Sequence, residues 1–83
     1  MLNYEEFKEW LTENKPYTKE TIGDMVSRLK RADSILPWFE DEVYFFRLDK
    51  ENKFQQLSCS VKSQIRKSVR LYFEFIEKSS RED

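Results

Sequence analysis

The sequence predicts an all-α fold, a compact domain of four helices. Apolar residues recur at helical spacing in three segments, helix-capping residues precede these segments, and a proline follows two of them. Aromatic residues make up 16% of the 83 positions, and rings of this size allow even a short chain to bury a core. We therefore expect one domain over residues 1–83, with helices near 3–14, 18–36, 41–48 and 60–78.

The first predicted helix begins at Asn3. Asn3 and Glu6 have the spacing of a capping box, in which the asparagine side chain accepts a backbone N–H of the first turn. Apolar residues then follow at helical spacing on one face. Because Pro16 disfavours helical geometry at the residue before it, this helix should end near residue 14.

The second predicted helix is capped by Thr18 and ended by Pro37. Gly23, the only glycine, lies inside it and costs about 1 kcal/mol relative to alanine. Either this glycine lets a neighbouring helix or a DNA backbone approach closely, or it is tolerated on a solvated face. Asp33 lies near the apolar stripe, so we expect a cap or a cation to satisfy its carboxylate.

Residues 38–57 are dense in aromatics, and helical and strand periods compete there. A short strand at 43–46 would have no partner strand and would leave its backbone groups unpaired, so a helix near 41–48 is favoured. Residues 50–57 either extend this helix or form a separate helical turn. The acidic run of Glu40, Asp41 and Glu42 suits the positive end of a helix dipole.

The last predicted helix has an apolar face and a basic face. Ser58 or Ser60 caps it, and its basic residues lie on an arc beside the apolar stripe, with no acidic residue between Ser60 and Phe73. Residues 79–83 are expected to form a frayed tail. The predicted core of the whole domain consists of Phe7, Trp10, Leu11, Ile22, Val26, Leu29, Leu36, Ile65, Val69, Tyr72 and Ile76.

The composition argues against catalysis, a bound metal or a cofactor. The chain has no histidine, one cysteine and one glycine, so neither an ordinary metal site nor a glycine-rich phosphate loop can be built. Cys59 is interpreted as a small spacer rather than a reactive thiol. The sequence shows no apolar run of membrane-spanning length and no signal peptide, so we expect a cytoplasmic protein with no membrane partner.

Two segments together resemble the N-terminal, SAM-like core-binding domain of phage integrases and other tyrosine recombinases. One is the turn Tyr17-Thr18-Lys19-Glu20-Thr21-Ile22, which opens a helix that continues to an aliphatic cluster at Leu36. The other is the last helix, from Ser60-Val61-Lys62-Ser63-Gln64-Ile65 to Leu71-Tyr72-Phe73-Glu74-Phe75-Ile76. The resemblance covers almost the whole chain and implies a four-helix SAM-like fold.

The resemblance also implies a function in DNA recombination. In this family the domain forms half of a clamp on duplex DNA, and basic side chains of its second and fourth helices contact phosphates and some bases. Carried over to this sequence, the contacts fall on Lys19, Lys30, Arg31, Lys62, Arg66, Lys67 and Arg70. The catalytic domain of these enzymes is missing and there is no histidine, so the four tyrosines are not nucleophile candidates and we expect no enzyme. Whether the chain is freestanding or cut from a longer enzyme stays open.

Two other interpretations of the surface stay open. The basic arc of the last helix could serve solubility and pair with Glu5, Glu9 and Glu13 of the first helix, and the net charge of −1 counts against strong DNA affinity. Alternatively, the domain is a protein-interaction module without DNA contact. A protein partner would then bind through the aromatic cluster of Trp38, Phe39, Tyr44, Phe45 and Phe46. This cluster exceeds what one short segment needs for a core, so we expect part of it to be exposed.

Overall fold

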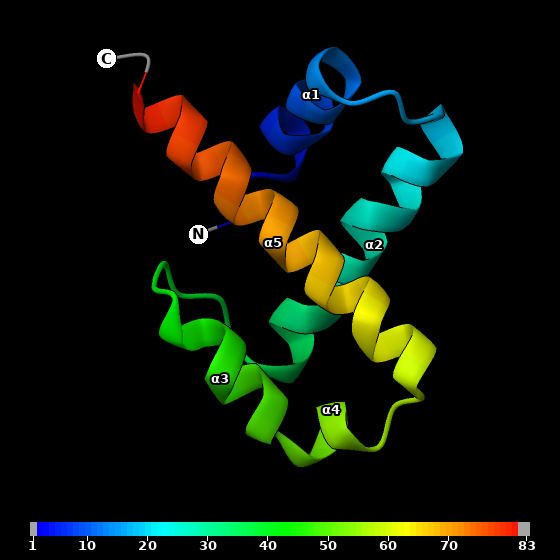
Figure 1. Cartoon of the computed structure of the whole chain (residues 1–83), viewed down its shortest axis with the longest axis vertical. Coiled ribbons are helices and arrows are strands. Elements are labelled where there is room, and N and C mark those ends of the chain that lie inside the picture. The colour runs from blue at the N-terminus through cyan, green and yellow to red at the C-terminus, as the bar shows by residue number, and fades with distance from the viewer. Residues whose placement is uncertain (1, 82–83) are drawn as a thin grey trace.

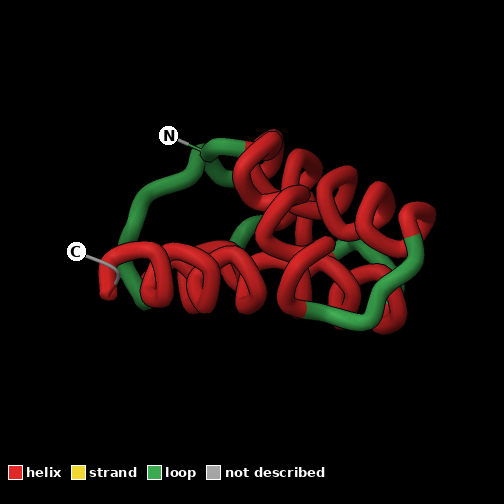
Figure 2. The backbone as a smooth tube through the Cα atoms, turned by 90° about the horizontal axis from the view of Figure 1, so that it is seen from above, coloured by secondary structure: helices red, strands yellow, loops and turns green. Residues whose placement is uncertain are grey.

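The architecture is built around one long C-terminal helix. The computed structural model describes residues 2–81, with 79–81 described by their backbone alone, and this part of the chain forms five helices and no strand. They are α1 (Tyr4–Asn14), α2 (Lys19–Ile35), α3 (Val43–Lys50), α4 (Asn52–Gln55) and α5 (Cys59–Arg81). In Figure 1, α5 crosses in front of α2, with α1 on one side of the crossing and α3 and α4 on the other. Seen from above, α2 and α5 lie in two layers (Figure 2), and the molecule measures 36 × 28 × 16 Å.

The predicted caps of three helices are confirmed. The side chains of Asn3, Thr18 and Ser58 accept hydrogen bonds from the backbone N–H groups three residues later, at 3.2, 3.2 and 3.3 Å. These bonds satisfy N–H groups that have no partner within the helix, and each of the three helices begins within one residue of its predicted start. At its other end α5 runs to Arg81, past the predicted end at residue 78, because no glycine or proline interrupts it. Residues 82–83 of the predicted tail lie outside the described residues.

The aromatic segment forms the two helices α3 and α4, which are separated at Glu51. The expected helix at 41–48 lies at 43–50, because Asp41 precedes it and its side chain accepts the Val43 N–H at 2.9 Å. The backbone is extended at Glu51, and α4 follows as the separate turn that was one of the two alternatives. Leu48 and Phe54 are both fully buried, although they would lie about 120° apart around one continuous helix. The break at Glu51 therefore allows both side chains to reach the core.

The core follows the predicted stripes and extends beyond them. Nine of the eleven predicted core residues are buried, whereas Trp10 and Ile76 are only half-buried and pack against the edge of the core. Helical spacing alone does not show that α3 and α4 also close over the core and supply buried side chains. The buried hydrophobic residues absent from the predicted core are Met25, Ala32, Tyr44, Leu48, Phe54, Leu71 and Phe75.

The connection from α2 to α3 is fastened by two polar contacts. Tyr44 donates its buried hydroxyl to the Leu36 carbonyl at 2.7 Å, and the Trp38 N–H donates to Asp33 Oδ1 at 2.8 Å. The prediction that a cap would satisfy Asp33 is thus confirmed, with a loop N–H as the donor. Burial raises the pKa of Tyr44 far above its ordinary value, and the charges of Asp33 and Tyr4 raise it further.

We predict that Tyr44 makes the protein sensitive to alkali. Above about pH 10 an unfolded tyrosine loses its proton while Tyr44 in the folded protein keeps it, so unfolding releases a proton. Its contribution to stability is complete below that pH and falls by up to about 1.4 kcal/mol per pH unit above it. Tyr44→Phe should flatten this fall in urea titrations, while costing about 1–3 kcal/mol at neutral pH because the Leu36 carbonyl loses its partner. Parallel stability curves above pH 10 would contradict the assignment.

A second prediction concerns Gly23. Its φ is not positive, and a Cβ added there would meet nothing within 4 Å, so no neighbouring helix requires this glycine. Gly23→Ala should raise the free energy of unfolding by about 0.5–1 kcal/mol in urea denaturation followed by circular dichroism. Ser27→Ala, at an exposed position of the same helix, serves as the control and should give a smaller gain. A loss of stability in Gly23→Ala would show that the open space is needed.

Candidate nucleic-acid interface

The position of α5 decides which of its side chains can meet a ligand. Its stripe from Ile65 to Phe75 is buried against the other helices, so the opposite side of the helix faces solvent. Four of the six basic residues of α5 lie before Phe73. Three of these four, Lys62, Arg66 and Arg70, lie in a row at four-residue spacing, with Lys67 beside them. The row from residue 62 to residue 70 spans about 12 Å along the helix. Every residue between Cys59 and Phe73 is neutral or basic.

The four cations differ in their surroundings. Arg70 lies on the side opposite the buried stripe, is exposed, and forms no ion pair with any described residue. Lys62 lies on the flank nearer α3 and α4 and is also without an ion pair among the described residues. Lys67 lies on the other flank, where its ammonium is 5.7 Å from the centre of the Tyr17 ring in the α1–α2 connection.

Arg66 is held by contacts within the fold. Its guanidinium donates to Asp49 Oδ1 of α3 from Nη2 at 2.7 Å and from Nε at 3.0 Å. The same group lies 5.3 Å from the centre of the Phe54 ring of α4. The Arg66 charge is therefore partly neutralised. Besides being a candidate DNA contact, Arg66 connects α5 to α3 and α4.

The acidic first helix does not neutralise the basic side of α5. Among the described residues, no ion pair joins α5 to Glu5, Glu9 or Glu13, so the interpretation that these glutamates pair with the basic arc is wrong. The one ion pair between α5 and the segment after α1 has the opposite polarity, since Lys15 Nζ lies 3.3 Å from Glu74 Oε1.

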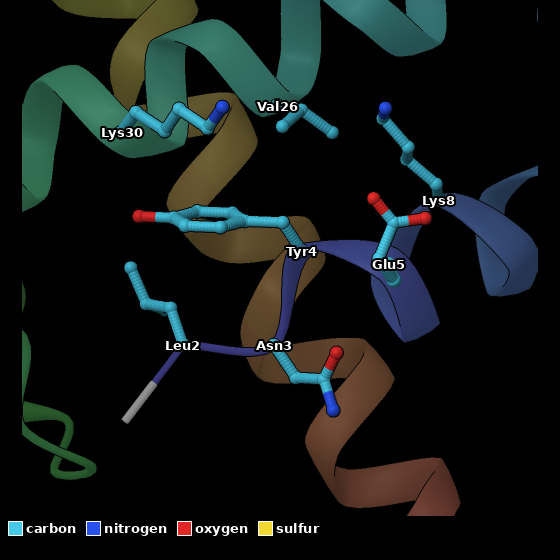
Figure 3. A pocket seen from close by; sticks show the side chains of 7 residues that line it. All are labelled: Leu2, Asn3, Tyr4, Glu5, Lys8, Val26 and Lys30. Carbon is cyan, nitrogen blue, oxygen red and sulfur yellow. The ribbon is translucent and has the colours of Figure 1, made fainter.

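The candidate residues of α2 do not join those of α5 on one surface. Because α2 and α5 pack against each other through their buried stripes, their exposed sides face away from each other (Figure 2). Arg31 is exposed on the side of α2 remote from α5, and Lys19 lies at the first residue of α2. Lys30 extends over the Tyr4 ring, 5.1 Å from its centre, in a hollow of about 380 Å³ between α1 and α2 that Glu5 and Lys8 also line (Figure 3).

The five aromatics proposed for a protein partner also separate. Tyr44 is fully buried, whereas Trp38, Phe39 and Phe45 are half-buried and pack against the core. Phe46 is the exception, because 70% of its side chain is exposed. The expectation that part of the cluster is exposed is therefore confirmed for Phe46, whereas the other four rings serve the fold and do not form one partner surface.

Sequence patterns could not identify the residues that support the α5 cations. Asp49 lies 17 positions before Arg66, and Tyr17 lies 50 positions before Lys67, so no local spacing links either pair. The side chains of the described residues form no group of three or more acidic, cysteine or histidine residues that could hold a metal ion. No helix in the described part of the chain has the length and apolar character needed to cross a bilayer.

Comparisons of the chain with known protein families, with curated proteins and with solved structures found no match.

We predict different stability effects for the two arginines of α5. Arg66→Ala should lower the free energy of unfolding by about 1 kcal/mol, because it removes a partly exposed ion pair and a ring contact. Arg70→Ala removes the same charge at an exposed position and should change stability by less than about 0.5 kcal/mol. Urea denaturation of both variants measures the difference. Equal effects would mean that the contact between Arg66 and Asp49 does not persist in solution.

Proposed function

We propose that the chain is a DNA-binding module that places the solvent-facing side of α5 against the phosphate backbone of a duplex. The observation behind this proposal is the set of cations on a helix whose opposite side is fixed in the core. Lys62, Lys67 and Arg70 carry charges that no acidic side chain of the described residues neutralises. Binding through such a helix loses little conformational entropy, because packing in the core already orders its backbone.

The chemistry of the surface favours phosphate contact over base readout. Lysine and arginine side chains bind phosphates through charge, and the resulting affinity depends strongly on salt and only weakly on sequence. Three engaged cations on a chain with net charge −1 suit a weak contact, with Kd values of about 10⁻⁴–10⁻⁶ M at physiological salt. The proposed role of the module is thus to bind the phosphate backbone of DNA, without a catalytic step.

The proposed contact is narrower than the two-helix contact that the resemblance to recombinases implies. Arg31 is exposed on the side of α2 opposite its buried residues, and the Lys30 ammonium lies over the Tyr4 ring, so neither is placed to share one duplex face with Arg70. Lys19 is exposed at the start of α2, two residues after the Tyr17 ring that Lys67 contacts, and is the α2 residue best placed to extend the α5 surface.

A salt titration of binding to a fluorescein-labelled duplex tests this function. Three engaged phosphates predict a slope of about −2.7 in log K against log salt concentration. Arg70→Ala should flatten the slope by about 0.9, and the double variant Lys67→Ala/Arg70→Ala by about 1.8. Fluorescence anisotropy from about 50 mM salt upward gives each slope.

Arg31→Ala is the matched control, because it removes one exposed cation from the side of α2 remote from α5. Its slope should equal that of the unmodified chain. Equal losses from Arg31→Ala and Arg70→Ala would show diffuse attraction and would overturn the α5 surface. An absence of binding at about 50 mM salt up to about 10⁻⁴ M protein would overturn the DNA-binding function itself.

A further inference from the structure

A second surface lies at the other end of α5 and has the opposite charge. A groove of about 900 Å³ runs between the start of α3 and the C-terminal half of α5. Its apolar lining comes from Phe45 and Phe46 of α3 and from Phe73 and Ile76 of α5. The Phe45 and Phe73 rings lie 5.3 Å apart between centres, and Phe73 lies 5.0 Å from Trp38, so the floor is continuous with the core.

The rim of this groove exposes the largest apolar side chain on the surface. Phe46 is 70% exposed and Val43 is 48% exposed. No other large hydrophobic side chain is exposed among the residues that the structure describes. Exposing an aromatic ring to water is unfavourable by itself, and a contiguous apolar surface with a polar rim is typical of an interaction site. The exposed ring is therefore a candidate anchor for a partner.

The polar part of the rim is acidic. Glu40, Asp41 and Glu42 line one end of the groove, Glu77 of α5 also lines it, and no cation does so among the described side chains. Asp41 caps α3 through its contact with the Val43 N–H, while Glu40 and Glu42 are exposed. Three successive carboxylates beside an apolar floor favour an occupant that combines apolar and basic side chains.

We propose that this groove binds an amphipathic helix of another protein, with the apolar face of that helix on Phe46, Phe73 and Ile76 and its basic side chains on Glu40 and Glu42. Docking of an amphipathic helix in an apolar groove is a recurrent mode of peptide recognition, and the acidic rim fixes the charge of the ligand. Duplex DNA does not fit this surface, because its phosphates would be repelled by the rim.

A second copy of this chain does not fit either. In a second copy, the basic charge would come from the solvent-facing side of α5. The residues on that side, at positions 63, 66, 67 and 70, are all polar, so it has no apolar side chain to place in the groove. A helix face without apolar side chains cannot fill an apolar groove. The partner is therefore a different segment, in which apolar and basic residues lie side by side on one helix.

A designed peptide tests the groove. The probe is a fluorescein-labelled amphipathic helix of about five turns, with leucine on one face and lysine on the flanks, and binding is followed by fluorescence anisotropy. We expect a Kd in the micromolar range, a loss of at least about 10-fold in Phe46→Ser, and much weaker binding of the same peptide with glutamate in place of lysine. Because Phe46 is largely exposed, circular dichroism should show that Phe46→Ser keeps the fold.

Matched charge variants separate the groove from general attraction. Glu40→Gln/Glu42→Gln should weaken binding of the leucine–lysine peptide, whereas Glu9→Gln/Glu13→Gln on α1 removes the same charge at exposed positions and should leave the affinity unchanged. Equal effects of the two pairs, or no binding up to about 10⁻⁴ M, would overturn the proposal. So would a dimer in analytical ultracentrifugation that Phe46→Ser dissociates, because the occupant would then be a second copy.

Discussion

The burial of one apolar stripe on α5 holds the domain together, because each of the other helices is anchored to it. The α1 helix packs through the Phe7 ring, whose centre lies 5.1 Å from that of Tyr72, and the Tyr72 hydroxyl accepts the Asn3 N–H at 2.8 Å. At the crossing with α2, the buried hydroxyl of Ser68 lies 3.3 Å from the sulfur of Met25. On the other flank, α3 and α4 meet α5 through rings and through Arg66. Because the inner side of α5 is occupied in this way, only its outer side and its C-terminal flank are free for ligands.

Features of the fold that depend on local chemistry could be predicted from the sequence. Asn3, Thr18 and Ser58 satisfy N–H groups only a few residues away, and the prolines limit α1 and α2 through their own backbone geometry. The sequence left open whether the helix continues past residue 50 or breaks, because no glycine or proline marks the break at Glu51. Both Leu48 and Phe54 are buried in a core that also contains side chains of α5. Helical periodicity within one segment does not show where the core formed by other helices lies.

The candidate site was predictable in its charge but not in its geometry. The sequence shows which side of α5 is basic, because one helix has a fixed periodicity. It does not show that Asp49 neutralises Arg66 or that the exposed sides of α2 and α5 face in opposite directions, since both facts depend on how separate helices pack. The density of aromatics between Trp38 and Phe46 was likewise visible, but the division into buried Tyr44 and exposed Phe46 follows from the rotation of α3 about its own axis.

The local distribution of charge makes a net charge of −1 compatible with the two ligands proposed above. Charged surfaces act over about one Debye length, roughly 8 Å at physiological salt, so a local surface is not governed by the net charge of the chain. Four of the six basic residues of α5 occupy positions 62–70. Glu74 lies one turn after Arg70 and is paired with Lys15 and Lys78, and the acidic groove lies along the C-terminal half of the helix. Under the DNA-binding proposal, phosphates are attracted to the residues at positions 62–70 and repelled by the acidic run of Glu40, Asp41 and Glu42 at the groove. A basic partner helix, as proposed for the groove, would be attracted to these carboxylates and repelled by the cations at positions 62–70, so the two proposed surfaces favour different ligands.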